Sequence, residues 1–154
     1  MAPVSEDPAP GGPASGGPAS GAPATGEAGA SERAALEPLQ SISALTLATA
    51  DMAASVAFYR ALGFVLLYGG PEAAFTSFRV GPGYLNLQAV AEPPSTEWGR
   101  AVLWVDDVDA MHARAVAAGF EPEAPPADAP WGERYFHLRD PSGHELSFAR
   151  PLDR

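Results

Sequence analysis

The stretch ADMAASVAFYRALGF, residues 50–64, decides the fold. Asp51 is placed to cap a helix, apolar residues follow at helical spacing, and Gly63 ends the pattern. The residues just before it, Ile42–Thr49, alternate between larger aliphatic and small side chains, as a half-buried strand does. A strand leading into a capped helix is therefore predicted.

The same pattern returns in VDDVDAMHARAVAAGF, residues 105–120. Asp107 precedes Gly119 by twelve positions, just as the earlier aspartate precedes its glycine, and a phenylalanine follows each glycine. Two helices of equal length with the same start and end indicate a duplicated unit.

Each unit is predicted to have the order βαβββ and to fold with its copy into one α+β domain, because neither is large enough to be stable alone. The predicted modules span about 42–90 and 99–150 within a domain of residues 41–154. The strands expected besides Ile42–Thr49 are Phe64–Tyr68, Ala74–Val80, Tyr84–Val90, Arg100–Val105, Phe120–Ala124, Glu133–Arg139 and His144–Ala149.

Residues 1–40 have a different composition, rich in Pro, Gly and Ala, and include the pentapeptide GGPAS twice in succession. Such a segment buries too little apolar surface to offset its chain entropy. A disordered, flexible tail is predicted here.

The charge balance excludes several classes of partner. Lys+Arg 9 against Asp+Glu 19 gives a formal net charge of -10, which disfavours nucleic acid and anionic membranes. The sequence has no cysteine, so disulfides and thiolate sites are excluded. No apolar run reaches the roughly 18 residues of a membrane helix, and a cytoplasmic protein is expected.

Three segments together resemble the vicinal oxygen chelate superfamily, which includes glyoxalase I, extradiol dioxygenases and bleomycin-resistance proteins. They are the two helix segments above and RDPSGHELSF, residues 139–148. The resemblance implies two βαβββ modules that form a cup-shaped mixed sheet around a small-molecule site. It also implies a homodimer whose cavities combine modules of both chains.

The superfamily's enzymes hold a metal with four side chains, usually His, Gln or Glu, on the first and fourth strand of each module. Matching the motifs puts these positions at Ala44, Asn86, Arg100 and Ser147, with Gln88 as the alternative to Asn86. Alanine has no donor atom and a guanidinium repels a divalent cation, so neither a metal nor another cofactor is expected.

The histidines do not supply a replacement metal site in the sequence pattern. His112 is interpreted as a helix-flank residue, and His144 as a partner of the turn before it. The direction of His137 depends on the turn register and stays open. A non-haem iron site needs two histidines and a carboxylate on one face, and no such triad is predicted.

Strand alternation predicts which side chains line the cup. The candidate ligand-binding residues are Thr46, Tyr84, Asn86, Gln88, Arg100, Trp104, Trp131, Glu145 and Ser147. Three alternatives stay open: Tyr84 and Trp104 fill the cup as core, Trp131 anchors its loop, and Arg100 pairs with Glu145 instead of binding a ligand's anionic group.

The missing metal ligands make the bleomycin-resistance branch the best match. The expected function is metal-independent small-molecule binding, such as sequestration of an antibiotic, with no catalytic residue. The alternative is an enzyme of the same superfamily, a lyase, isomerase or dioxygenase with an atypical site. A third hypothesis, an interaction module carried by the flexible tail, has no motif to support it.

Overall fold

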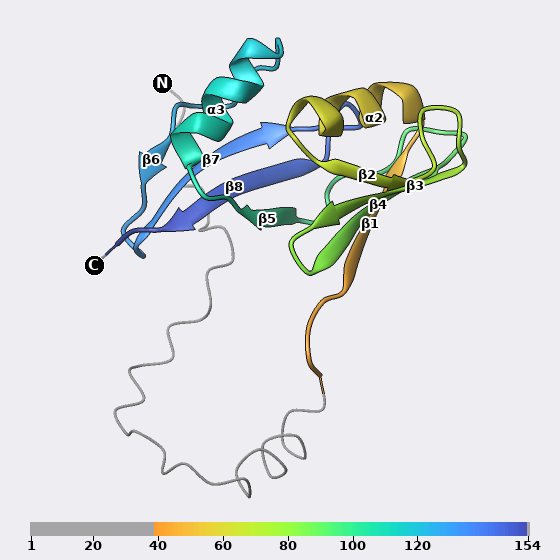
Figure 1. Cartoon of the computed structure of the whole chain (residues 1–154). Helices are drawn as coiled ribbons and strands as arrows, with labels where there is room; N and C mark the ends of the chain where they lie inside the picture. The colour runs from red at the N-terminus through yellow and green to blue at the C-terminus, as the bar shows by residue number, and fades with distance from the viewer. Residues whose placement is uncertain (1–38, 154) are drawn as a thin grey trace, which may run out of the picture.

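The computed structural model describes residues 39–153 and contains two four-stranded sheets, each with one helix (Figure 1). The first sheet has the order β1 (Ala44–Thr49), β4 (Gly83–Ala89), β3 (Phe75–Val80), β2 (Val65–Tyr68), with helix α2 (Met52–Ala61). The second has the order β5 (Arg100–Trp104), β8 (Glu145–Pro151), β7 (Glu133–Arg139), β6 (Ala127–Asp128), with helix α3 (Val108–Ala117).

This architecture confirms the predicted α+β fold of two βαβββ modules. In both sheets the first and last strands of the module pair in parallel and the other pairs are antiparallel. The hydrogen bonds divide the eight strands into two sheets instead of joining them in one. The predicted tail, residues 1–40, lies outside the described residues except for its last two.

The helices begin and end where the repeated motif predicts. The carboxylates of Asp51 and Asp107 accept hydrogen bonds from the third backbone N–H beyond each, both at 2.9 Å. Gly63 and Gly119 follow the helices with φ of +97° and +88°, a left-handed conformation that glycine adopts without the steric cost of a side chain.

The predicted strand at Phe120–Ala124 is wrong. The fourth strand of the second sheet is the two-residue β6, and the predicted segment makes one backbone bond to β7, from Glu123 N–H to His137 O at 3.0 Å. Pro122 lies inside the predicted strand and has no N–H to donate, and Pro125 and Pro126 follow it, so a ladder cannot continue there.

One apolar core joins the two modules. Phe58 of α2 meets Phe120 from the second module, with ring centroids 4.6 Å apart. Beside this contact, the buried Tyr59 hydroxyl donates to Asp140 Oδ2 at 2.8 Å. Burial, and then the charge of Asp140, raise the pKa of Tyr59 well above its ordinary value.

The turn between β7 and β8 also ties the modules together. The His144 ring accepts a hydrogen bond from Trp98 Nε1 at 2.9 Å and donates to Ala48 O at 2.8 Å. Indole only donates, which places the His144 proton on Nε2. The prediction that His144 bonds its own turn is confirmed at its backbone N–H, which donates to Asp140 Oδ1 at 2.9 Å.

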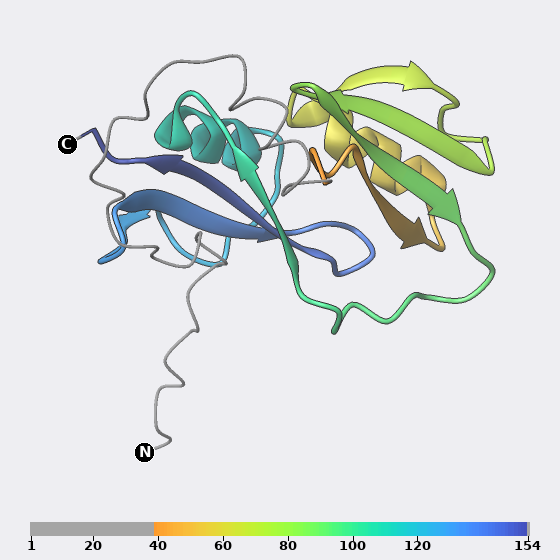
Figure 2. The same ribbon diagram turned by 90° about the horizontal axis from the view of Figure 1, so that it is seen from below.

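Both helices lie on the same side of the sheets, as Figure 2 shows from the opposite side. The sheet faces turned away from the helices are called the open faces below. Within residues 39–153, no helix is long and apolar enough to cross a membrane.

Candidate functional site

The open face of the first sheet carries four of the predicted residues. Thr46 pairs in register with Asn86, and Tyr84 and Gln88 follow the same alternation along β4. Asn86 Nδ2 donates to Thr46 Oγ1 at 3.3 Å. The residues between them, Leu85 and Leu87, are buried toward the helix, so the alternation places these side chains as predicted.

The open face of the second sheet carries Arg100, Trp104, Glu145 and Ser147. Register also places three residues of β7 on this face: Tyr135 opposite Ala149, His137 opposite Ser147 and Arg139 opposite Glu145. The direction of His137, left open by the sequence, is therefore toward the predicted site. Tyr135 and Arg139 were not among the site residues predicted from the sequence. The alternation along β7, combined with the length of the turn to β8, could have indicated that they face the site.

Arg100 lies in a hydrogen-bonded network. Its Nε contacts Glu145 Oε1 at 3.1 Å, and its Nη1 contacts His137 Nε2 at 3.3 Å. The Arg100–Glu145 ion pair, one of the two alternatives for Arg100, is therefore present. The pair lies on the predicted binding face, so it is compatible with a second role of Arg100 in binding the anionic group of a ligand.

The same network fixes the proton on His137. A guanidinium can only donate, so His137 Nε2 accepts and Nδ1 carries the hydrogen. Nδ1 then donates to Ser147 Oγ, 3.0 Å away. In this arrangement His137 cannot take a proton from Ser147, so the pair is not an activated serine nucleophile.

The residues present do not fit a metal ion. Within residues 39–153 there is no group of three or more His, Cys, Asp or Glu side chains that could hold one. At the four matched positions, Ala44 offers no donor atom and the Arg100 guanidinium repels cations. No reaction step through a metal is supported by this donor set.

The aromatic candidates have different surroundings. Trp131 stacks on Tyr135 with ring centroids 5.6 Å apart, and its Nε1 donates to Glu133 Oε2 at 2.9 Å. Trp131 is thus anchored in its loop while 37% exposed, which is compatible with both of its expected roles. Tyr84 and Trp104 are 41% and 68% exposed, so neither fills the core of the described chain.

A hollow of about 460 Å³, called the seam hollow here, lies between the first sheet and β5. Tyr84, Trp98 and Arg100 line it together with aliphatic side chains of β1, β3 and β5. Of the predicted site residues, it brings Tyr84 and Arg100 together although they belong to different modules.

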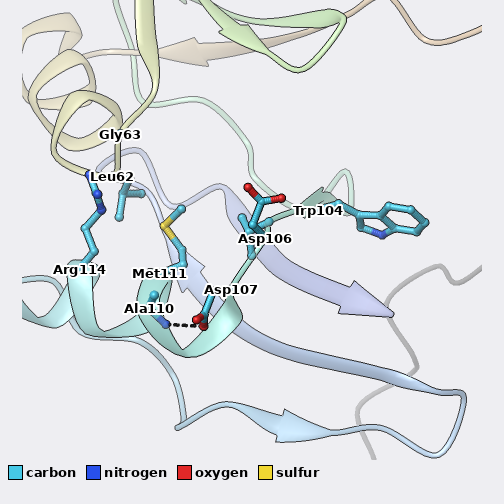
Figure 3. A pocket seen from close by; sticks show the side chains of 9 residues that line it. Leu62, Gly63, Trp104, Asp106, Asp107, Ala110, Met111 and Arg114 are labelled. Atoms are coloured by element: carbon cyan, nitrogen blue, oxygen red, sulfur yellow. Dashed lines mark hydrogen bonds between the residues drawn. The ribbon is translucent and has the colours of Figure 1, made fainter. Parts of the chain in front are cut away.

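A second hollow of about 450 Å³ lies beside the C-terminal end of α2 and the first turns of α3 (Figure 3). Arg114 and Trp104 stand at opposite ends of its labelled residues, and the Trp104 indole points away from the others. The Asp107 carboxylate here is already engaged in capping α3. Trp104 is the one predicted site residue among those that line this hollow.

Comparison with known families agrees with the geometry. The family model of the Glyoxalase/Bleomycin resistance protein/Dioxygenase superfamily matches residues 41–148. The chain belongs to this superfamily. The resemblance found in the sequence is therefore confirmed.

Solved structures of other superfamily members share this fold. TioX from Micromonospora sp. ML1 is 30% identical, with 73% of this chain and 100% of that chain covered at a TM-score of 0.61. A bleomycin resistance determinant encoded on the transposon Tn5 is 22% identical, with 73% of this chain and 98% of that chain covered at a TM-score of 0.60. Lactoylglutathione lyase from Agrobacterium tumefaciens is 23% identical, with 73% of this chain and 94% of that chain covered at a TM-score of 0.59.

The last two similarities establish the fold alone, since a bleomycin resistance determinant and a lactoylglutathione lyase are about equally similar to this chain. A search of curated proteins found no match.

Proposed function

We propose that this superfamily member is a metal-independent small-molecule-binding protein of the bleomycin-resistance type. The observation that carries the proposal is Arg100, at a matched metal-ligand position and bonded to His137 and Glu145. A fixed cation held there by two side chains leaves no role for a divalent ion. The tautomer of His137 also leaves Ser147 without a general base.

The proposed binding surface is the pair of open faces, completed by a second copy of the chain. The first open face offers neutral polar groups, such as Thr46 and Asn86, and the second offers Trp104, Trp131 and charged groups. Aromatic walls with a few hydrogen-bonding groups are typical of small-molecule sites. The homodimer and a cytoplasmic location stay predictions.

The first test is elemental analysis of the chain purified without chelators. We expect far less than one equivalent of Ni, Zn, Fe or Mn per chain. A stoichiometric metal would contradict the proposal and favour the alternative, a superfamily enzyme with an atypical site.

The second test is a tryptophan fluorescence titration with bleomycin. Binding near Trp104 and Trp131 should change their emission in a saturable way, and Trp131→Phe should reduce the response. Arg134→Gln, on the helix-facing side of β7, is the matched control and should respond like the unmodified chain. A flat response would exclude bleomycin as the ligand.

A further inference from the structure

We propose that the seam hollow binds an apolar organic carboxylate, with the carboxylate on Arg100. This inference rests on the proposed binding function and names its ligand class. The hollow shares Arg100 and Tyr84 with the open faces, and it lies within one chain, between the first sheet and β5. Figure 2 shows β5 crossing between the strands of the two sheets.

The lining of the hollow sets the chemistry of the ligand. Among the described residues that line it, Arg100 is the one charged side chain; the others are aliphatic, small or aromatic, as Leu45, Val102 and Tyr84 illustrate. An apolar body is favoured by such walls, since it removes their surface from water. A single guanidinium at the edge selects a single anionic group.

The Glu145 side chain already shows that a carboxylate fits this guanidinium. Its Oε1 lies 3.1 Å from Arg100 Nε, and both side chains are mostly buried, at 19% and 16% exposure. Charge-assisted hydrogen bonds of planar carboxylates to guanidinium are among the strongest in proteins. We therefore assign the ligand's anionic group as a carboxylate.

Glu145 can release Arg100 without losing its own countercharge. Its second oxygen, Oε2, lies 3.3 Å from Arg139 Nη2, so the carboxylate is shared between two arginines. When a ligand carboxylate takes Nε of Arg100, Glu145 stays paired with Arg139. His137 continues to bind Nη1 of Arg100, so the guanidinium keeps its orientation during the exchange. His137 is thus a positioning residue for Arg100, while Arg139 holds Glu145.

The test compares two probes of the same shape, 2-naphthoate and 2-naphthamide, by titration calorimetry with the full chain. We expect the anion to bind about ten times more tightly than the neutral amide, the size of effect that one charge-assisted contact gives. Arg100→Gln should bring this ratio close to one. Glu145→Gln should raise naphthoate affinity about three- to tenfold, because a competing carboxylate is removed.

Arg134→Gln is the control for loss of an arginine from the second module. Arg134 is bound to Asp109 and Asp128, both at 2.8 Å or less, and does not line the seam hollow. The probe ratio should stay near ten in this variant. Thermal denaturation of every variant establishes that it is folded before the titrations are compared.

The outcomes separate this inference from the proposed function. Equal affinity for the two probes in the unmodified chain overturns the carboxylate assignment and leaves small-molecule binding intact. Glu145→Gln should raise naphthoate affinity only if Glu145 competes with the ligand for Arg100. Weaker naphthoate binding in this variant therefore overturns the proposed exchange of carboxylates on Arg100. If neither probe binds at millimolar concentration, the inference is wrong, while metal analysis and the bleomycin titration decide the proposed function independently.

Discussion

At the scale of single residues, Arg100 changes what the superfamily's site can do. A divalent metal attracts lone pairs from neutral and anionic groups alike, whereas a guanidinium offers N–H donors in one plane and prefers planar anions. Arg100 also determines the tautomer of His137, which determines the role of Ser147. Arg100 thus bears on both parts of the proposed function, the misfit of the donor set to a metal ion and the hydrogen-bonding role of Ser147.

Tyr59 provides a prediction at the same scale. Its hydroxyl donates to the buried Asp140 carboxylate, and Tyr59→Phe removes that donor. We expect the free energy of unfolding in urea at pH 7 to fall by about 1.5–3 kcal/mol, the range for hydrogen bonds to charged groups. Tyr68→Phe, at a 67% exposed position, should change stability by less than about 0.5 kcal/mol.

The pH dependence of this difference has a definite sign. The pKa of Tyr59 is raised in the folded state, so its stabilisation is fully present below the unfolded value of about 10. It is lost progressively as the pH rises from there toward the folded-state pKa. The stability gap between the unmodified chain and Tyr59→Phe should therefore narrow above about pH 10. A gap that widens with pH would contradict this linkage.

At the scale of elements, the helices could be predicted from neighbouring residues, whereas strand pairing and register could not. Both helices follow from an aspartate cap and a glycine end, which are contained in about a dozen neighbouring residues. The predicted strand Phe120–Ala124 does not form because Pro122 has no N–H to donate to a ladder. The direction of His137 could not be predicted, because it depends on the register of β7 against β8.

Two glycines allow a matched prediction about these elements. Gly119→Ala meets nothing within 4 Å of its new Cβ, so only its φ of +88° should matter, at about 1 kcal/mol. Gly69→Ala also has a positive φ, of +78°, and its Cβ would lie 2.3 Å from Phe75 O, a backbone atom. We expect Gly69→Ala to cost about 2 kcal/mol more, measured by urea unfolding. Equal losses would show that the β2–β3 connection yields to the methyl group.

At the scale of the whole molecule, the two sheets present their open faces on the side away from both helices. Large apolar side chains remain exposed there, including Trp104 at 68% and Tyr84 at 41%. The core that joins the modules lies on the other side, around Phe58, Tyr59 and Phe120. The two modules therefore share a packed core on the helix side, while their candidate binding surfaces on the open faces stay exposed.

Burial of these surfaces in a second copy is the last prediction. Sedimentation velocity of the full chain at micromolar concentration should give a species of twice the chain's mass. Trp104→Asp should shift it to the monomer, since a carboxylate would replace apolar area and lose its hydration in the interface. Val116→Asp, at a 52% exposed position on α3, is the control and should remain a dimer. A monomer at every concentration would contradict this prediction and would leave the seam hollow, which lies within one chain, as the candidate site.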